Sequence, residues 1–330
     1  MKKFINNVDT IVDEMVEGIV YSNPDKLVKV PNYNVVCRKD FNKDHVALVS
    51  GGGSGHEPAH AGYVGYGMLS GAVAGPIFTS PTPDMVQAAI NQLDSNKGTL
   101  LIIKSYTGDI MNFQIAAEME KAMGKNVDYV VVDDDIALIE NKNAAGKRGI
   151  AGTVFVHKIA GAKAESGAPL EEVKAVALKA IKNTATMGIG LDGCTVPAAG
   201  KRGFNLPDDE VEMGLGIHGE PGIAREKMKP ADEFTQIVTD KIINYLQLQA
   251  NDKVAVLING LGATPLMELY VINKKVNEML KDKNIKVVKN FVGNYMTSID
   301  MPGMSISLIK LDDELEQLVC AKCETLAFNV

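Results

Sequence analysis

The chain has 330 residues, of which 46% are hydrophobic and 23% charged, so it is long enough to form two domains that each bury a core. Its formal net charge of −7 argues against a surface that binds nucleic acid, because such surfaces need clustered lysine and arginine. No apolar run in the sequence approaches the roughly 20 residues that cross a bilayer, and acidic residues interrupt the N-terminal stretch that could act as a signal sequence. We therefore expect a cytoplasmic protein with no membrane and no direct nucleic-acid partner.

The first part of the chain predicts a helix followed by strands that alternate with helices. Apolar residues recur at helical spacing over 8–20, which predicts an amphipathic N-terminal helix. Short, almost entirely apolar runs predict strands buried on both faces at 46–49, 99–103 and 129–132. Helices are predicted between them at 83–93, with Thr82 as N-cap, and at 110–123. This alternation favours a largely parallel α/β sheet, whose ligands bind at the carboxyl ends of the strands.

The second part of the chain predicts another, smaller α/β unit. Helices at 151–165 and 170–187 are expected to end the first part, and the second part is expected to contain helices at 231–248 and 265–280. Strands are expected at 211–217, 254–258, 286–292 and 305–309. A glycine-rich stretch from 188 to 199 separates the two parts. We therefore predict two α/β domains with mainly parallel or mixed sheets flanked by helices, covering residues 1–187 and 188–330.

Two glycine-rich segments each combine a histidine with an acid–proline pair, at 50–60 and 214–222. Glycine adopts backbone conformations closed to other residues and lets main-chain N–H groups approach a ligand, while proline stiffens the exit of a loop. Each segment therefore predicts a loop that presents a reactive imidazole. The residues around the two segments do not align, so we infer no internal repeat.

Two motif matches within these segments are weaker than they look. Residues 56–60 fit the HExxH pattern, in which a helix presents two zinc-binding imidazoles one turn apart. Pro58 disfavours helical backbone at Glu57, so we expect a loop and no metal site. The spacing of glycines in 214–219 fits the dinucleotide fingerprint, but no helix start follows it. No P-loop or kinase catalytic loop is recognisable either, so the chain shows no nucleotide site.

Two further clusters have ordinary explanations beside the functional ones. The consecutive carboxylates at 133–135 suit magnesium, yet a solvated turn between strand and helix is the favoured interpretation. Cys320 and Cys323 form a lone CxxC, which without a second ligand pair favours C-terminal packing over a redox or zinc role.

Four separated blocks of the sequence share their order and spacing with one known family, at 50–84, 104–113, 149–158 and 214–222. They resemble the dihydroxyacetone-binding K subunits of dihydroxyacetone kinases, over the whole chain. The resemblance departs from the usual pattern at Pro76, where an acid is common, and at Ser105, where asparagine is usual. Neither position touches the expected chemistry directly.

The resemblance implies roles for three catalytic residues. His218 matches the histidine that holds dihydroxyacetone covalently as a hemiaminal, and an imidazole nitrogen is able to add to an unhindered ketone. Asp109 matches the base that accepts a proton from the substrate hydroxyl, with His56 assisting. Taken alone, Asp109 is equally suited to cap a helix that begins at Ile110, and the two roles are compatible.

The same resemblance implies a set of substrate-binding residues. Lys104 would direct its ammonium group at substrate oxygens or at the incoming phosphoryl group, and Gly53 would offer its backbone N–H. Ser80 would contribute a hydroxyl, and Ser54 and Gly55 belong to the same glycine-rich loop. A lysine at a strand end is otherwise most often solvated.

The resemblance also implies partners. As the substrate-binding subunit of a phosphotransferase-dependent dihydroxyacetone kinase, the chain would form a homodimer and bind no cofactor itself. A separate L subunit would hold ADP or ATP with Mg²⁺, and an M subunit carrying phosphohistidine would recharge it. The alternative is a dihydroxyacetone-sensing co-regulator that binds the ligand without phosphorylating it and acts with a transcription factor.

Overall fold

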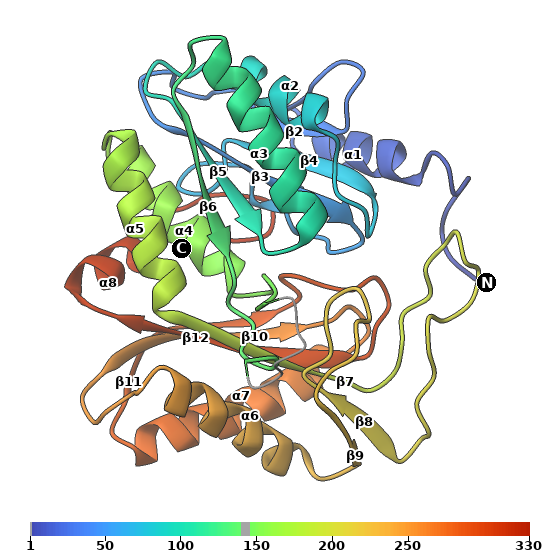
Figure 1. Cartoon of the computed structure of the whole chain (residues 1–330). Coiled ribbons are helices and arrows are strands. Elements are labelled where there is room, and N and C mark those ends of the chain that lie inside the picture. The colour runs from blue at the N-terminus through green and yellow to red at the C-terminus, as the bar shows by residue number, and fades with distance from the viewer. Residues whose placement is uncertain (1, 140–145) are drawn as a thin grey trace. The chain divides into compact units, whose positions relative to one another are not determined.

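The computed structural model describes residues 2–139 and 146–330, and the chain divides into two compact units (Figure 1). Unit 1 contains Met1–Val132, Val156–Ala180 and Leu318–Val330, and unit 2 contains Asp133–Phe155 and Ile181–Gln317. This division differs from the single boundary expected after residue 187. The C-terminal segment belongs to unit 1 because its backbone pairs there: Ala327 N–H donates to Gly62 O at 3.0 Å.

Unit 1 contains a six-stranded mixed sheet in the order β1-β2-β4-β3-β5-β6. Its strands are β1 (Leu27–Lys29), β2 (Val35–Arg38), β3 (Ala47–Ser54), β4 (Gly71–Ile77), β5 (Thr99–Lys104) and β6 (Val127–Val132). The last four are mutually parallel where they pair, and β1 and β2 form an antiparallel edge. The expected parallel sheet is therefore confirmed, with three strands (β1, β2 and β4) that the apolar runs did not predict.

The helices of the first part of the chain follow the predicted pattern with shifted ends. They are α1 (Ile11–Ser22), α2 (Pro83–Leu93), α3 (Thr107–Ala122), α4 (Thr153–Glu165) and α5 (Leu170–Lys182). A 3₁₀ turn at Ala61–Tyr63 and α8 (Asp313–Cys320) near the C-terminus were not predicted. Side chains of α2 and α3 pack with those of the central strands in one core. Within residues 2–139 and 146–330, no helix combines the length and hydropathy needed to cross a membrane.

Unit 2 contains a second six-stranded sheet in the order β11-β10-β12-β7-β8-β9. Its strands are β7 (Thr184–Gly190), β8 (Glu210–Met213), β9 (Ala224–Lys227), β10 (Lys253–Gly260), β11 (Lys286–Gly293) and β12 (Gly303–Leu311). Only the β10–β11 pair is parallel among the described strands of this sheet. Residues 184–187, expected to end a helix, begin β7 instead, because Thr184–Gly190 pairs with the buried strand β12 and tertiary pairing outweighs local pattern.

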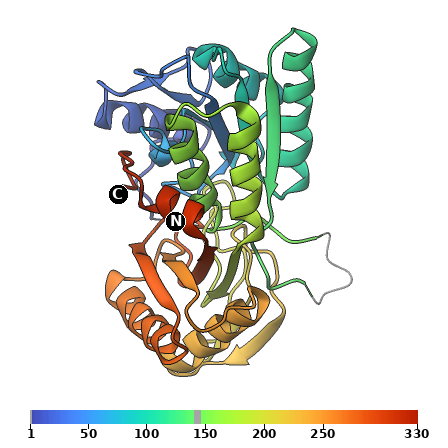
Figure 2. The same cartoon turned by 90° about the vertical axis from the view of Figure 1, so that its left-hand side faces the viewer.

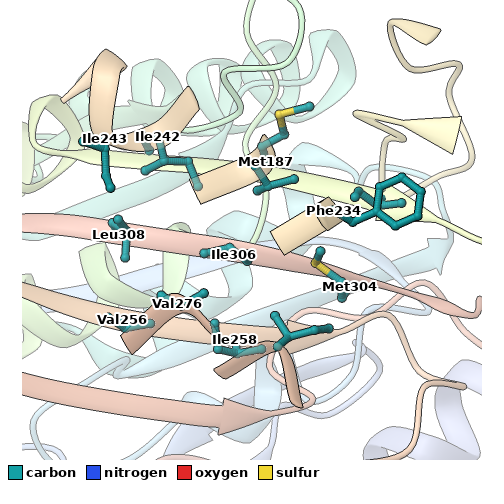
Figure 3. Close-up of a cluster of buried hydrophobic side chains, with 14 of the residues drawn as sticks. Met187, Phe234, Ile242, Ile243, Val256, Ile258, Val276, Met304, Ile306 and Leu308 are labelled. Atoms are coloured by element: carbon teal, nitrogen blue, oxygen red, sulfur yellow. The ribbon is translucent and has the colours of Figure 1, made fainter. Parts of the chain in front are cut away.

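Helices α6 (Ala231–Tyr245) and α7 (Leu266–Asp282) run side by side along one face of the second sheet (Figure 2). Their apolar stripes bury against β7, β10 and β12 in a continuous cluster (Figure 3). The labelled members are Met187, Phe234, Ile242, Ile243, Val256, Ile258, Val276, Met304, Ile306 and Leu308. This core holds rigid the sheet from which the loop of residues 214–223 projects.

The glycines of the first predicted loop lie inside a strand. Gly51 and Gly53 belong to β3, and both are buried. A Cβ atom on Gly51 would lie 2.4 Å from the carbonyl oxygen of Val73 on the neighbouring strand β4. The glycines therefore let β3 and β4 approach closely, which is a packing requirement that the sequence pattern alone does not distinguish from a loop.

This close approach predicts the effect of adding one methyl group. Gly51→Ala should lower the free energy of unfolding by roughly 1–3 kcal/mol, because the backbone of β4 must move away. Urea unfolding measures the change. Gly18→Ala is the matched control: it lies in α1 with no atom within 4 Å of the new Cβ, and it should stabilise by about 0.5–1 kcal/mol. Equal unfolding midpoints for Gly51→Ala and the parent would contradict the interpretation.

Candidate active site

Three of the predicted site residues, two of them buried and Ser80 half-buried, form one cluster in unit 1. Lys104 ends β5, and Asp109 lies in the first turn of α3, which begins at Thr107 rather than at Ile110. The Lys104 ammonium lies 3.2 Å from Asp109 Oδ2, and the Ser80 hydroxyl donates to Asp109 Oδ1. Asp109 is 3% exposed and Lys104 only 1%. The lysine is thus a buried partner of the carboxylate and is not solvated, although a lysine at a strand end usually would be.

A glycine allows this pair to form. A Cβ atom on Gly52 would lie 2.3 Å from the Lys104 Nζ and 3.2 Å from Asp109 Oδ2. The Lys104 Nζ also lies 3.4 Å from the carbonyl oxygen of Gly51. The glycine-rich end of β3 therefore makes room for a charged pair where any other residue would displace it.

His56 follows this strand in a turn. Its imidazole is fully buried and stacks on the Phe78 ring, with 5.1 Å between centroids and 19° between planes. Residues 55–60 are turns and bends, so the HExxH match is not helical, as expected. Among the residues that the structure describes, no cluster of three or more histidine, cysteine or acidic side chains is suited to hold a metal.

The other predicted residues of the glycine-rich segment 50–60 make local hydrogen bonds. The Ser54 hydroxyl donates to Gly75 O at 2.7 Å, and Gly53 pairs with Gly75 across β3 and β4. The Gly55 N–H lies 3.0 and 3.1 Å from the two carboxylate oxygens of Glu57. Burial raises the pKa of Glu57 against the lowering effect of these backbone N–H groups. The carboxylate after His56 thus folds back on its own loop.

His218 lies in unit 2, in the loop that joins β8 to β9. Its ring Nδ1 is 2.9 Å from Glu220 Oε1, and its backbone N–H donates to Glu220 Oε2 at 2.8 Å. The ring is partly accessible, with 21% of the side chain exposed. Gly214 and Gly219 adopt positive φ of 73° and 81°, which turns the chain sharply after β8. The expected strand at 211–217 therefore ends at Met213.

The ionisation of Glu220 decides which ring nitrogen of His218 carries the proton. Burial alone would raise the pKa of Glu220, but its contacts with His218 and the backbone hydrogen bonds that it accepts lower it to about 2, well below neutral pH. A carboxylate ionised at neutral pH accepts hydrogen bonds and donates none, so His218 Nδ1 must be the donor. In the neutral imidazole the lone pair then resides on Nε2, which is the nitrogen able to act as nucleophile.

A second pair of buried histidines lies in unit 1. His60 Nδ1 is 3.0 Å from His157 Nε2, and Ser50 Oγ is 3.5 Å from His60 Nδ1. Burial and the nearby Lys104 ammonium lower the pKa of His157 to about 3. The same two causes lower the pKa of His60 well below its ordinary value. Both rings are therefore neutral, and His60 Nδ1 is paired with His157 in the core of unit 1.

The carboxylates at 133–135 each have a protein partner. Asp133 pairs with Lys147 at 3.0 Å, and Asp135 pairs with Arg148 at 2.7 Å. Burial raises the pKa of Asp134 to about 6, although it accepts the Ile150 and Gly152 N–H groups. The favoured interpretation as a solvated turn is therefore wrong, because Asp134 and Asp135 are each only 1% exposed.

The CxxC pair lies at the C-terminal end of unit 1. Within the part of the chain that the structure describes, Cys320 and Cys323 form no disulfide. Cys320 is exposed, whereas Cys323 is buried and its Sγ lies 3.8 Å from the carbonyl oxygen of Phe328. The buried cysteine therefore packs in the C-terminal segment, as the sequence favoured.

Sequence reasoning did not single out Glu220 as the partner of His218. The signal was present, because an acid two residues after a histidine is placed to accept both its backbone and its ring N–H. It also missed Arg148, for which no local signal exists, because its contacts lie far away in the sequence. The cluster of Ser80, Lys104 and Asp109 was assembled from separate predictions, and the structure brings them together.

The fold is that of a known family. A model of the Dak1 domain matches residues 17–327, and the chain belongs to this family. It is 52% identical over 314 residues, 95% of either chain, to the PTS-dependent dihydroxyacetone kinase 1, dihydroxyacetone-binding subunit DhaK, of Listeria innocua. The resemblance inferred from the four sequence blocks is thus confirmed.

Solved structures of the family share the fold. The dihydroxyacetone kinase from C. freundii in complex with AMP-PNP and Mg²⁺ matches with a TM-score of 0.92 and 36% identity, over 99% of this chain and 61% of that one. The dihydroxyacetone kinase operon co-activator Dha-DhaQ matches with a TM-score of 0.91 and 37% identity, over 95% and 97% of the two chains.

The tautomer of His218 is directly measurable. Glu220→Gln should raise the population with the proton on Nε2, because the neutral amide no longer requires Nδ1 to donate. Nitrogen-15 NMR of the labelled imidazole distinguishes the two nitrogens. Glu226→Gln, which changes an acid of β9 that pairs with Lys229, is the control. An unchanged His218 spectrum in Glu220→Gln would contradict the proposed tautomer.

The buried His157 predicts a dependence of stability on pH. Its pKa is about 3 in the folded protein and near 6.5 when unfolded, so below pH 6.5 the unfolded state binds a proton that the folded state does not. Stability should therefore fall as the pH decreases from 6.5 towards 3, by about 1.4 kcal/mol per pH unit for this group. His157→Gln should make the slope shallower by that amount in urea unfolding. Parallel slopes for parent and variant would show that His157 is not the titrating group.

Proposed function

We propose that this protein is the substrate-binding subunit of a phosphotransferase-dependent dihydroxyacetone kinase. The observation that carries the proposal is the His218–Glu220 pair, in which an ionised carboxylate holds the ring Nδ1 at 2.9 Å. Membership of the Dak1 family and the name of the Listeria innocua relative support the substrate. Dihydroxyacetone is small and uncharged, so a covalent bond compensates for the few contacts that it offers.

The covalent step follows from the tautomer. His218 Nε2 donates its lone pair to the ketone carbon, the carbon–oxygen π bond breaks, and its electrons move to the oxygen. The ring is then positively charged and the oxygen negatively charged. The proton on Nδ1 passes to the new alkoxide by way of the Glu220 carboxylate or water, which leaves a neutral hemiaminal. The reverse proton transfer releases the ketone, so the bond is reversible.

The phosphoryl transfer step requires a base. A primary hydroxyl of the bound dihydroxyacetone attacks the terminal phosphorus of the nucleotide, its proton passes to Asp109, and the bond between that phosphorus and the nucleotide's bridging oxygen breaks. His56 assists as a second acid–base group. Each carboxylate oxygen of Asp109 keeps a second lone-pair direction beside the one used by Ser80 or Lys104. Lys104 and Ser80 stabilise charge near the substrate, with the backbone of Gly53, Ser54 and Gly55.

The phosphoryl donor comes from a partner in this proposal. An L subunit binds ADP or ATP with Mg²⁺, and an M subunit returns the phosphoryl group from phosphohistidine. The C. freundii kinase supports this arrangement, because its chain is longer than the region matched here and its structure contains AMP-PNP and Mg²⁺. This chain would bind no cofactor, act as a homodimer and work in the cytoplasm, where nucleotide donors are found.

A second candidate function is favoured by one comparison. The co-activator of the dihydroxyacetone kinase operon shares the fold at 37% identity. In that case the protein would bind dihydroxyacetone on His218 and act on a transcription regulator without phosphorylating the ligand. The presence of Asp109, Lys104 and His56 supports the kinase, because ligand capture alone needs no proton acceptor for a substrate hydroxyl.

Two substitutions separate binding from transfer. With dihydroxyacetone labelled with carbon-13 at the ketone, the parent should show the carbon resonance move from the carbonyl range to the range of saturated carbon. His218→Gln should abolish that change. Asp109→Asn should retain it but reduce phosphorylation by the purified L and M subunits about 10²–10⁴-fold.

The outcomes distinguish the candidates. An adduct in the parent without any phosphorylated product in the full system would favour the co-regulator. No adduct in the parent would end the proposal for His218. Asp84→Asn, which changes an exposed acid in the first turn of α2, serves as the control for Asp109→Asn.

A further inference from the structure

A buried arginine in unit 2 joins the start of the His218 loop to the segment that follows β6. Arg148 is 7% exposed, and its Nε and Nη2 each lie 2.7 Å from Asp135 Oδ2. Its backbone carbonyl accepts the Asp135 N–H at 3.0 Å. The other carboxylate oxygen of Asp135, Oδ1, accepts a hydrogen bond from the Ala137 N–H at 2.9 Å. The guanidinium is therefore fixed by a short chain segment that contains no residue of the expected site.

The same guanidinium reaches the glycine loop. Arg148 Nη2 donates to the carbonyl oxygen of Gly214 at 2.7 Å, at the residue where the chain leaves β8. The Gly214 N–H is also tied down, since it donates to Gly188 O at 2.8 Å. The first residue of the loop is therefore held on both sides, by a strand of the sheet and by the arginine.

The third guanidinium nitrogen lies beside the carboxylate that orients His218. Arg148 Nη1 is buried and makes no hydrogen bond within the described part of the chain. A Cβ atom on Gly216 would lie 2.6 Å from this nitrogen and 2.0 Å from Glu220 Oε2. Glycine at 216 thus lets a positive group and the Glu220 carboxylate occupy neighbouring space. Buried donors without a partner are rare in folded proteins and call for an explanation.

We propose that Arg148 is a positioning residue for the His218 chemistry: it holds the loop at Gly214 and places its third nitrogen beside the Glu220 carboxylate that orients the imidazole. This inference rests on the proposed function of His218. Arg148 acts through Glu220 and does not touch the substrate. Its positive charge favours the ionised carboxylate throughout the addition, including the stage at which that carboxylate takes the proton from Nδ1.

The neighbouring charges are consistent with this role. Burial raises the pKa of Asp135, Arg148 opposes that effect, and the charge of Glu220 adds to it. Arg148 thus opposes the rise in the pKa of Asp135 and has its third nitrogen near the Glu220 carboxylate. Its neighbour Lys147 differs, because it pairs with Asp133 at 3.0 Å and lies 5.6 Å from the centre of the Tyr245 ring.

A double-mutant cycle separates positioning from simple support of the fold. The first variant combines Arg148→Met with Asp135→Asn, which removes both buried charges together and retains an acceptor for the Ala137 N–H. The readout is the dissociation constant of the labelled dihydroxyacetone adduct on the full-length protein. We expect about tenfold weaker binding in this variant, and no further weakening when it is added to Glu220→Gln. Lys147→Met is the matched control and should bind as the parent does.

The conservative variant Arg148→Lys decides the question if the paired variant does not fold. Lysine preserves the charge beside Asp135 but offers no fork that bonds Asp135 and Gly214 together while placing a further nitrogen beside Glu220. We expect Arg148→Lys to weaken the adduct when Glu220 is intact, and to have no further effect when it is combined with Glu220→Gln. Equal binding by Arg148→Lys and the parent, or equal losses with and without Glu220→Gln, would overturn the inference. A parent without any adduct would instead refute the proposed function.

Discussion

A hydrogen bond between the His218 ring and the Glu220 carboxylate is the interaction on which the proposed chemistry depends. It works because the carboxylate is ionised at neutral pH and can only accept, so the ring must present its lone pair on the other nitrogen. The bond requires a very tight loop, and positive φ at Gly214 and Gly219 supplies it. The loop in turn needs a rigid base, which the buried cluster of β7, β10 and β12 with α6 and α7 provides.

Unit 1 contains a buried ion pair between Lys104 and Asp109. A lysine and an aspartate are both almost completely buried, and each charge would be costly there without its partner. The glycines at the end of β3 leave the space in which the two groups meet, and the Ser80 hydroxyl satisfies a further oxygen. The charge of Lys104 also acts at a distance, because it helps to keep His60 and His157 neutral. A glycine-rich strand end thus serves packing and charge placement together.

Most helices and buried strands were predictable because their apolar periodicity is local. The central strands and α2, which begins at Pro83, follow the predicted pattern. Strand β4 was missed because glycine and proline break its apolar run, and the N-terminal part of β7 was predicted as helix because its neighbour β12 lies more than a hundred residues away. The division into units also could not be predicted, since it depends on where helices α4 and α5 and the C-terminal segment pack.

By itself, the sequence determined the class of fold and the family, because the order and spacing of motifs are properties of the chain. Only the tertiary structure decided that Gly51 and Gly53 are strand residues, that Lys104 is buried against Asp109, and that Glu220 and Arg148 surround the His218 loop. The physical reason is that charge pairing and close packing depend on distances between atoms remote in the sequence, and no local pattern encodes those distances.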